Sequence, residues 1–208
     1  MKRSIINWSL VLAVSLAACG SGVADSSFAG STSAAVAPGM AAAQSLSQED
    51  GNAVEAPTVI NYCERTGGVY ELRRAEYGTN NPHPLPLARY AGFCKYTAAD
   101  TSRIYILAST LYTKLPTLAV LAYEAKVPTG SCQGNPASCY CTLLGGSDQF
   151  GGTSLAGGGW VLKNSVDPSL EACIFPDMSS IDSWGLAYHA HSIIRGIDLT
   201  KVVRYHQN

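Results

Sequence analysis

Alternation of apolar and polar residues predicts several short strands in the chain after residue 56. Val69 to Arg73 alternates in this way, and Gly159 to Lys163 does so after the turn-prone pair Gly157-Gly158. Ala172 to Phe175 is a third candidate strand, and Ile193 to Tyr205 alternates in places, as expected of a strand that closes a sheet. Short strands of this kind pair readily as hairpins, so we expect a small antiparallel sheet.

Four short helices are predicted around these strands. Asn135 is a good N-cap before Pro136, and Gly145-Gly146 supplies a left-handed end, which gives a helix over residues 136–144 with a counterpart over 57–66. A third helix is predicted over Thr117–Lys126, with one apolar face formed by Leu118, Leu121, Ala122 and Ala125. The fourth spans Ile181–His189, with Ser180 as its cap. The predicted class is α+β.

The first residues have the pattern of an export signal. Lys2 and Arg3 precede an apolar run from Trp8 to Ala18, which at eleven residues is too short to span a bilayer. The run ends in Leu16-Ala17-Ala18-Cys19, which resembles the lipobox of bacterial lipoproteins. That resemblance implies cleavage before Cys19, acylation of Cys19 and, with Gly20 after it, an outer-membrane location. More than one acyl chain is needed for stable anchoring, and a lipidated N-terminal cysteine provides it.

Composition divides the chain further and removes some classes of partner. The stretch from Gly20 to about Glu55 is rich in Ala, Ser, Gly and Gln, which is typical of a flexible linker. The 208 residues include 14 basic and 15 acidic ones, and loss of Lys2 and Arg3 leaves 12 basic against 15 acidic. This balance gives no reason to expect nucleic acid as a partner. We therefore expect a signal peptide at 1–18, a lipidated cysteine and linker at 19–55, and a folded part beyond.

Two segments of the folded part share an order of residues that suggests a duplication. Tyr62-Cys63 and Tyr140-Cys141 are each followed, after three residues, by a pair of glycines. A second cysteine follows in both segments, Cys94 and Cys173, and Tyr105 and Trp184 each lie eleven residues after it. We therefore predict two repeated small units over 56–130 and 131–208, each a short helix with antiparallel strands, stapled by disulfides.

The second unit also resembles a known bacterial family. Asn135-Pro136-Ala137-Ser138, Tyr140-Cys141, Gly145-Gly146 and the run from Cys173 through Phe175-Pro176-Asp177 to Trp184 are similar to a small domain of unknown function whose members carry the label hemolysin. The first unit keeps fewer of these positions. The resemblance implies no activity, because the label is an inherited name.

The family pattern bears on the disulfides. Its third and fourth cysteines are both missing here, with Ile181 and Ser102 at the third position, so the resemblance leaves Cys63 to pair with Cys94 and Cys141 with Cys173. Cys132 and Cys139 then remain as a third pair, although Cys139 and Cys141 could exchange roles. Six cysteines besides Cys19 is the even number that a disulfide framework requires.

Residues with catalytic or ligating chemistry are few, and each has a simpler structural interpretation. His189 and His191 could ligate a metal if they lay two apart on a strand, although a polar pair at a helix end is the preferred interpretation. Cys132 with Cys139-x-Cys141 could bind a metal or act in redox chemistry, but disulfides are favoured in an oxidising compartment. A triad could be drawn from Ser179, Ser180 or Ser183 with His189 and Asp177, without any G-x-S-x-G motif.

These observations favour binding over catalysis. We expect a lipid-anchored protein of the cell envelope, held to the membrane through Cys19, that binds an envelope protein, peptide or glycan and uses no cofactor or metal. The alternatives are an inhibitor of an envelope or extracellular hydrolase and, less favoured, a hydrolase or metal-dependent enzyme that uses the region of His189 and His191. No catalytic residue is assigned.

Overall fold

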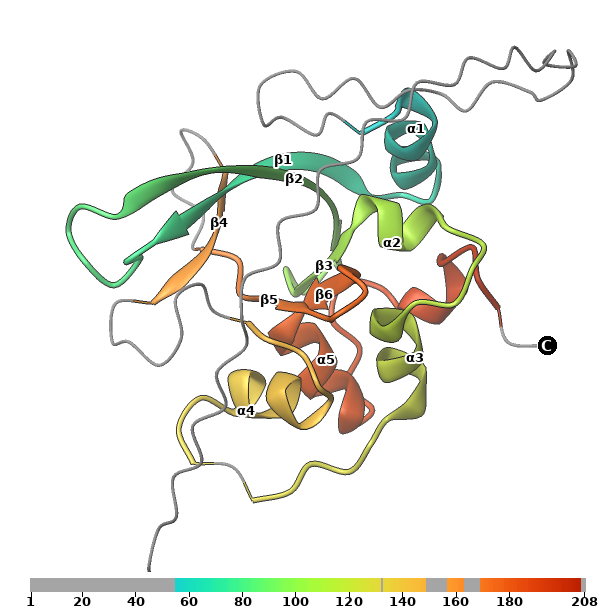
Figure 1. Cartoon of the computed structure of the whole chain (residues 1–208). Coiled ribbons are helices and arrows are strands. Elements are labelled where there is room, and N and C mark those ends of the chain that lie inside the picture. Colours follow the sequence, from blue (N-terminus) through green and yellow to red (C-terminus); the bar gives the residue numbers. More distant parts are fainter. Residues whose placement is uncertain (1–54, 132, 149–156, 163–168, 207–208) are drawn as a thin grey trace, which may run out of the picture. The chain divides into compact units, whose positions relative to one another are not determined.

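The computed structural model describes residues 55–131, 133–148, 157–162 and 169–206 (Figure 1). The helices are α1 (Pro57–Arg65), α2 (Ala108–Tyr112), α3 (Leu118–Ala125), α4 (Pro136–Leu143), α5 (Ser183–Ala190) and the 3-10 turn η1 (Leu199–Lys201). The strands are β1 (Val69–Tyr77), β2 (Leu85–Thr97), β3 (Arg103–Leu107), β4 (Gly158–Leu162), β5 (Ala172–Ile174) and β6 (Ser180–Asp182). The predicted α+β class is confirmed. The predicted signal peptide, Cys19 and the linker up to residue 54 lie outside the described residues.

The strands form one curled antiparallel sheet in the order β4-β1-β2-β3-β6-β5 (Figure 1). Because side chains alternate across a strand, the two faces build separate cores. One face contributes Ile104, Ile106 and Ile181 to the larger core, which it shares with the helices. The other face contributes Phe93 and other residues to a smaller core, whose remaining buried members are Ala75, Tyr105, Trp160, Leu170 and Ala172.

The helices that local sequence defines best begin and end close to where they were predicted. The Asn135 side chain accepts hydrogen bonds from the backbone N–H groups of Ala137 (2.9 Å) and Ser138, and Pro136 fills the first turn of α4. Gly145 then takes φ +85°, and Gly67 takes φ +88° after α1. Thr117 caps α3 through the N–H of Val120. These matches rest on capping chemistry, which is local to the chain.

Other predicted elements are wrong in position or kind. Helix α5 begins at Ser183 with Asp182 as its cap, whereas Ser180–Asp182 forms strand β6 between β5 and β3. The residues from Ile193 to Tyr205 form no strand and contain only the short turn η1.

The predicted face of α3 is also wrong. Its buried side chains are Ala119, Val120 and Tyr123, whereas Leu118 is exposed. The N-terminus of α3 is fixed from outside the helix, because Asp177 Oδ2 accepts from Leu118 N and Ser179 Oγ accepts from Ala119 N. Contacts distant in sequence therefore set the rotation of this helix.

Disulfides staple the two segments as expected. Cys63 is bonded to Cys94 and Cys141 to Cys173, and all four residues are fully buried. Cys139 is also in a disulfide bond, but its predicted partner Cys132 lies outside the described residues. The Cys63–Cys94 bridge ties α1 to β2, and the Cys141–Cys173 bridge ties α4 to β5.

The two segments correspond at several positions besides the cysteines. Cys94 lies opposite Ile106 in the β2–β3 hairpin, and Cys173 lies opposite Ile181 in the β5–β6 hairpin. Ile106 and Ile181 are themselves paired, where β3 meets β6. A helix follows directly after β3 and after β6. These relations are those of an approximate two-fold axis between the two hairpins, but the duplication itself stays a prediction.

The proposed equivalence of two aromatic residues is wrong in detail. The hairpin register places Tyr105 in β3, whereas Trp184 lies one residue inside α5. The second hairpin is shorter by two residues on each side of its turn, because Cys94 lies twelve residues before its pairing partner Ile106 and Cys173 eight before Ile181. Equal spacing along the chain therefore does not mean equal position in the fold.

Candidate functional site

An open polar cavity lies among the described residues where the C-terminal ends of α3 and α5 meet the η1 turn. It has a volume of about 370 Å³. Its lining residues are Glu124, Lys126, His189, Asp198, Thr200 and His206. These come from one end of α3, the last turn of α5, the η1 turn and the C-terminal segment. We call this feature the polar cavity.

His189 is the buried residue of the polar cavity. Its side chain is only 2% exposed, and its ring stacks on that of Tyr123 with the centroids 3.6 Å apart. His189 Nδ1 lies 2.9 Å from the backbone oxygen of Tyr123. A carbonyl oxygen only accepts, so Nδ1 carries the proton and Nε2 keeps its lone pair. In the described part of the chain, the hydrogen bond found for the His189 ring is this one through Nδ1.

Electrostatics favour the neutral form of this imidazole. Burial lowers the pKa of His189, and this effect outweighs the hydrogen bond to the Tyr123 carbonyl, which raises it. Lys126 also lowers this pKa and Asp198 raises it. His189 is therefore a neutral hydrogen-bond acceptor toward the cavity at pH 7.

Two carboxylates give the cavity its negative charge. Asp198 caps η1, since its Oδ1 accepts from the backbone N–H of Thr200 (3.1 Å) and from its hydroxyl (2.7 Å). Glu124 reaches the cavity from the last turn of α3. Lys126, in the left-handed conformation at the end of α3, is the opposing positive charge.

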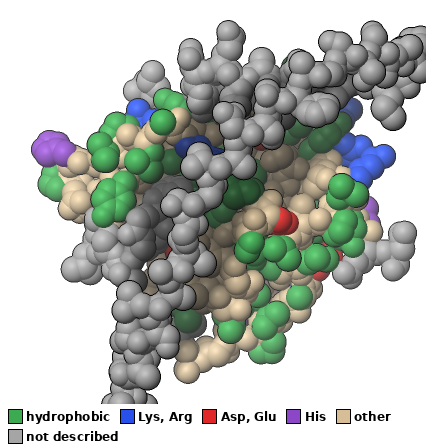
Figure 2. Space-filling view, in the orientation of Figure 1, with side chains coloured by type: hydrophobic (Ala, Val, Ile, Leu, Met, Phe, Trp, Pro, Cys, Tyr) green, Lys and Arg blue, Asp and Glu red, His purple; other side chains and the backbone are tan. Residues whose placement is uncertain are grey.

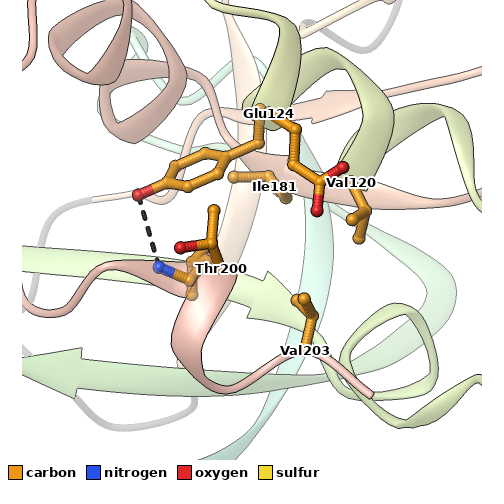
Figure 3. Close-up of a pocket in the computed structure, with 7 residues that line it drawn as sticks. Val120, Glu124, Ile181, Thr200 and Val203 are labelled. Atoms are coloured by element: carbon orange, nitrogen blue, oxygen red, sulfur yellow. Dashed lines mark hydrogen bonds between the residues drawn. The ribbon is translucent and has the colours of Figure 1, made fainter. Parts of the chain in front are cut away.

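An apolar crevice adjoins the polar cavity and shares Glu124 and Thr200 with it (Figure 3). Val120, Ile181 and Val203 line the crevice, which is too narrow for a water molecule. The Tyr123 hydroxyl accepts from the backbone N–H of Leu199 at 3.4 Å, the bond dashed in Figure 3. The crevice therefore acts as a packed wall, and ligand space lies on the polar side.

The two histidines singled out in the sequence do not share a site. Both lie at the end of a helix, where residues two apart point about 200° from each other around the axis. His189 is buried, whereas His191 is exposed and lies 3.2 Å from the Thr129 hydroxyl. The expected surface pair is thus wrong for His189. Within the described residues no cluster of three or more His, Cys, Asp or Glu side chains could hold a metal ion.

The serine triad that could be drawn from the sequence is not assembled. Ser179 Oγ donates to Asp177 Oδ1 (2.6 Å) and accepts from Ala119 N (3.0 Å), and the pair organises a turn beside α3. His189 makes its side-chain hydrogen bond to Tyr123 instead. Ser180 and Ser183 are buried at the other end of α5. His189 lies six positions after Ser183 in the helix, which is about 9 Å along the axis.

A second polar cluster lies on the sheet face of the smaller core, and it is structural. Arg73 is fully buried and donates to Glu71 Oε2 (2.6 Å), to the Trp160 carbonyl (3.1 Å) and to the Tyr105 hydroxyl (3.3 Å). Lys95 forms a second ion pair with Glu71. Because Arg73 and Glu71 are buried and hydrogen-bonded to each other and to the sheet, we assign the cluster a structural role.

The sequence pointed to His189 but not to its neighbours. The other lining residues are spread from position 124 to position 206 and follow no spacing rule. The one local signal was Asp198-Leu199-Thr200, a capping pattern that predicts a turn rather than a binding site.

Comparison of the chain with protein-family models, curated proteins and solved structures found no match. The resemblance to the hemolysin-labelled family therefore stays a prediction. In the part of the chain that the structure describes, no helix has the length and apolar character needed to cross a membrane.

Proposed function

We propose that this chain is a lipid-anchored binding protein of the bacterial cell envelope. Two features support the proposal. The Leu16–Cys19 sequence follows two basic residues and an apolar run, and the domain contains disulfide bonds, which suit an oxidising compartment. Cys19 holds the protein in the membrane, the segment up to residue 55 acts as a tether, and the domain presents the ligand site.

The observation that carries the binding role is the polar cavity with His189 in its wall. The cavity of about 370 Å³ falls within the range of small-ligand sites. Its lining combines the neutral imidazole of His189 with two carboxylates, a set of acceptors that suits a ligand carrying N–H or O–H donors. Among the described residues that line the cavity, the single hydroxyl belongs to Thr200 and is bound to Asp198, so binding suits the site better than nucleophilic catalysis.

The test is capture of partners from the envelope. Residues 20–208, made in a form that keeps the disulfides, are added to cross-linked envelope fractions beside a Glu124→Gln, His189→Asn double variant. A specific partner or muropeptide that the double variant loses supports the proposal. Equal recovery by both proteins contradicts the role of the cavity, and recovery of none by the intact protein contradicts binding.

A second candidate, inhibition of a hydrolase, has one observation in its favour. Leu115, Leu118 and Met178 are large apolar residues that are 71%, 43% and 53% exposed. Leu115 and Met178 lie on loops and Leu118 begins α3, and the Leu118 N to Asp177 Oδ2 hydrogen bond joins the two segments. Hydrophobic side chains are widespread on the face seen in Figure 2. If a captured partner is a hydrolase, loss of its inhibition on Leu115→Asp with retention by Glu124→Gln would assign the function to these loops.

A further inference from the structure

We propose that the polar cavity binds a primary ammonium group, which donates one hydrogen bond to His189 Nε2 and is paired with the carboxylates of Glu124 and Asp198. This inference deepens the proposed function, because it rests on the same cavity and names the chemistry of its ligand. It concerns the free cationic group alone, whether carried by a small amine or by a lysine side chain.

The first step is the direction of the hydrogen bond at the buried imidazole. Nδ1 donates to the Tyr123 carbonyl, so the nitrogen left for a ligand is an acceptor. The ring cannot turn to offer a donor without losing that bond and its parallel stack on Tyr123, where the rings are inclined by only 5°. The ligand must therefore present an N–H or O–H group.

The second step is the sign of the field. Among the described lining residues, the carboxylates Glu124 and Asp198 outnumber the one lysine, Lys126. The C-terminal ends of α3 and α5 also meet here, and each adds about half a negative charge from its backbone carbonyls. A donor that is also a cation satisfies both the acceptor nitrogen and this field.

The charged groups near His189 come from several elements, and their balance favours a cationic ligand. Glu124 and Lys126 come from α3, Asp198 from η1 and His206 from the C-terminal segment. Helix α4, which also packs on α5, contains no charged residue. Asp182 lies at the opposite end of α5. Among the described residues that line the cavity, Lys126 is the lysine that opposes an incoming ammonium group, and its removal should favour binding.

The experiment uses residues 20–208 with intact disulfides and Nα-acetyl-lysine methylamide as the probe, followed by ¹⁵N NMR of the histidine side chains in 150 mM NaCl. We expect a saturable shift of His189 Nε2, with His191 unaffected. The same compound acetylated on Nε should bind at least tenfold more weakly, and n-butylammonium should shift the same signal.

Charge variants, and the effect of probe binding on the pKa of His189, distinguish binding at this site from nonspecific electrostatic attraction. Glu124→Gln should weaken binding about tenfold, Lys126→Gln should strengthen it, and Glu64→Gln on α1 should leave it unchanged. Because protonated His189 cannot accept, the bound probe should lower the apparent pKa of His189. Equal binding of the acetylated probe, no saturable shift, or a raised His189 pKa would overturn the inference. Partner capture that depends on the cavity would still support the proposed function in each case.

Discussion

Replacing Gly68 by alanine should break the packing around the first disulfide. An added Cβ would lie 2.3 Å from Cys94 Sγ, 3.0 Å from Cys63 Sγ and 3.1 Å from the Cys63 carbonyl oxygen. Gly146 stands in the same relation to the second bridge, since its Cβ would lie 2.4 Å from Cys173 Sγ and 2.9 Å from Cys141 Sγ. These sulfur atoms are buried and bonded, so they cannot move away as the end of a flexible side chain could.

The expected loss of stability lies between the cost of overpacking and the cost of losing the disulfide bond. Overpacking that leaves the bridge intact costs about 1–3 kcal/mol. Failure to form the bridge removes a cross-link between residues 31 apart, for which the chain-entropy model gives about 3.5–4 kcal/mol. We therefore expect Gly68→Ala and Gly146→Ala each to lower the free energy of unfolding by about 2–4 kcal/mol.

Urea unfolding, together with peptide mapping under non-reducing conditions, measures both parts of this prediction. Gly130→Ala is the matched control, because its Cβ meets nothing within 4 Å. Gly67→Ala separates out backbone strain, since Gly67 has φ +88° and nothing near its Cβ, and should cost about 1 kcal/mol. If Gly68→Ala unfolds at the same urea concentration as Gly130→Ala, the close packing of glycine on the disulfide is refuted.

Three further predictions test other parts of the molecule. Asp182 is buried, and burial raises its pKa to about 6, so its contribution to the stability of the fold should be lost as the pH rises from about 4 to 6. Asp182→Asn keeps an acceptor for the helix cap and should remove this loss when urea unfolding is measured at several pH values. An unchanged pH profile in the variant would contradict the prediction. Arg73→Met leaves Glu71 buried with one partner fewer and should lower the free energy of unfolding by about 3 kcal/mol in thermal unfolding. The control Arg74→Met breaks a part-exposed pair with Glu76 and should lower it by about 1 kcal/mol or less. Equal losses in the two variants would argue against the buried network. Cys19→Ser should abolish labelling by fatty acid in cells, and undiminished labelling would exclude Cys19 as the lipid site.

The elements that could be predicted are those whose ends are set by neighbouring residues. Helix α4 was found because Asn135, Pro136 and Gly145 act on backbone groups within a few positions of themselves. Helix α5 was misplaced because Ser180 and Asp182 are both competent caps, and pairing of β6 with β5 and β3 decides between them. Strand β2 was missed, since Leu85, Pro86 and the residues after them are exposed and show no clean alternation.

The candidate site was less predictable than the fold for a related reason. His189 could be noted from its residue type, but its burial and its bond to Tyr123 depend on α3 packing beside α5. Glu124, Asp198 and Thr200 carry no signal until tertiary contacts bring them together. Sequence reasoning can locate a chemically capable residue, but not the surroundings that give it a role.

The polar cavity lies where the correspondence between the two halves of the fold stops. Leu107 and Asp182 occupy matching positions before α2 and α5, yet α2 ends at Tyr112 whereas α5 continues to Ala190. Counting from these caps, the position that corresponds to His189 is Lys114, which lies beyond the end of α2 and is exposed. The first half therefore cannot form an equivalent buried imidazole. The buried imidazole thus belongs only to the helix after β6 among the described residues, whereas a disulfide, a glycine packed against it and a hairpin occur in both segments.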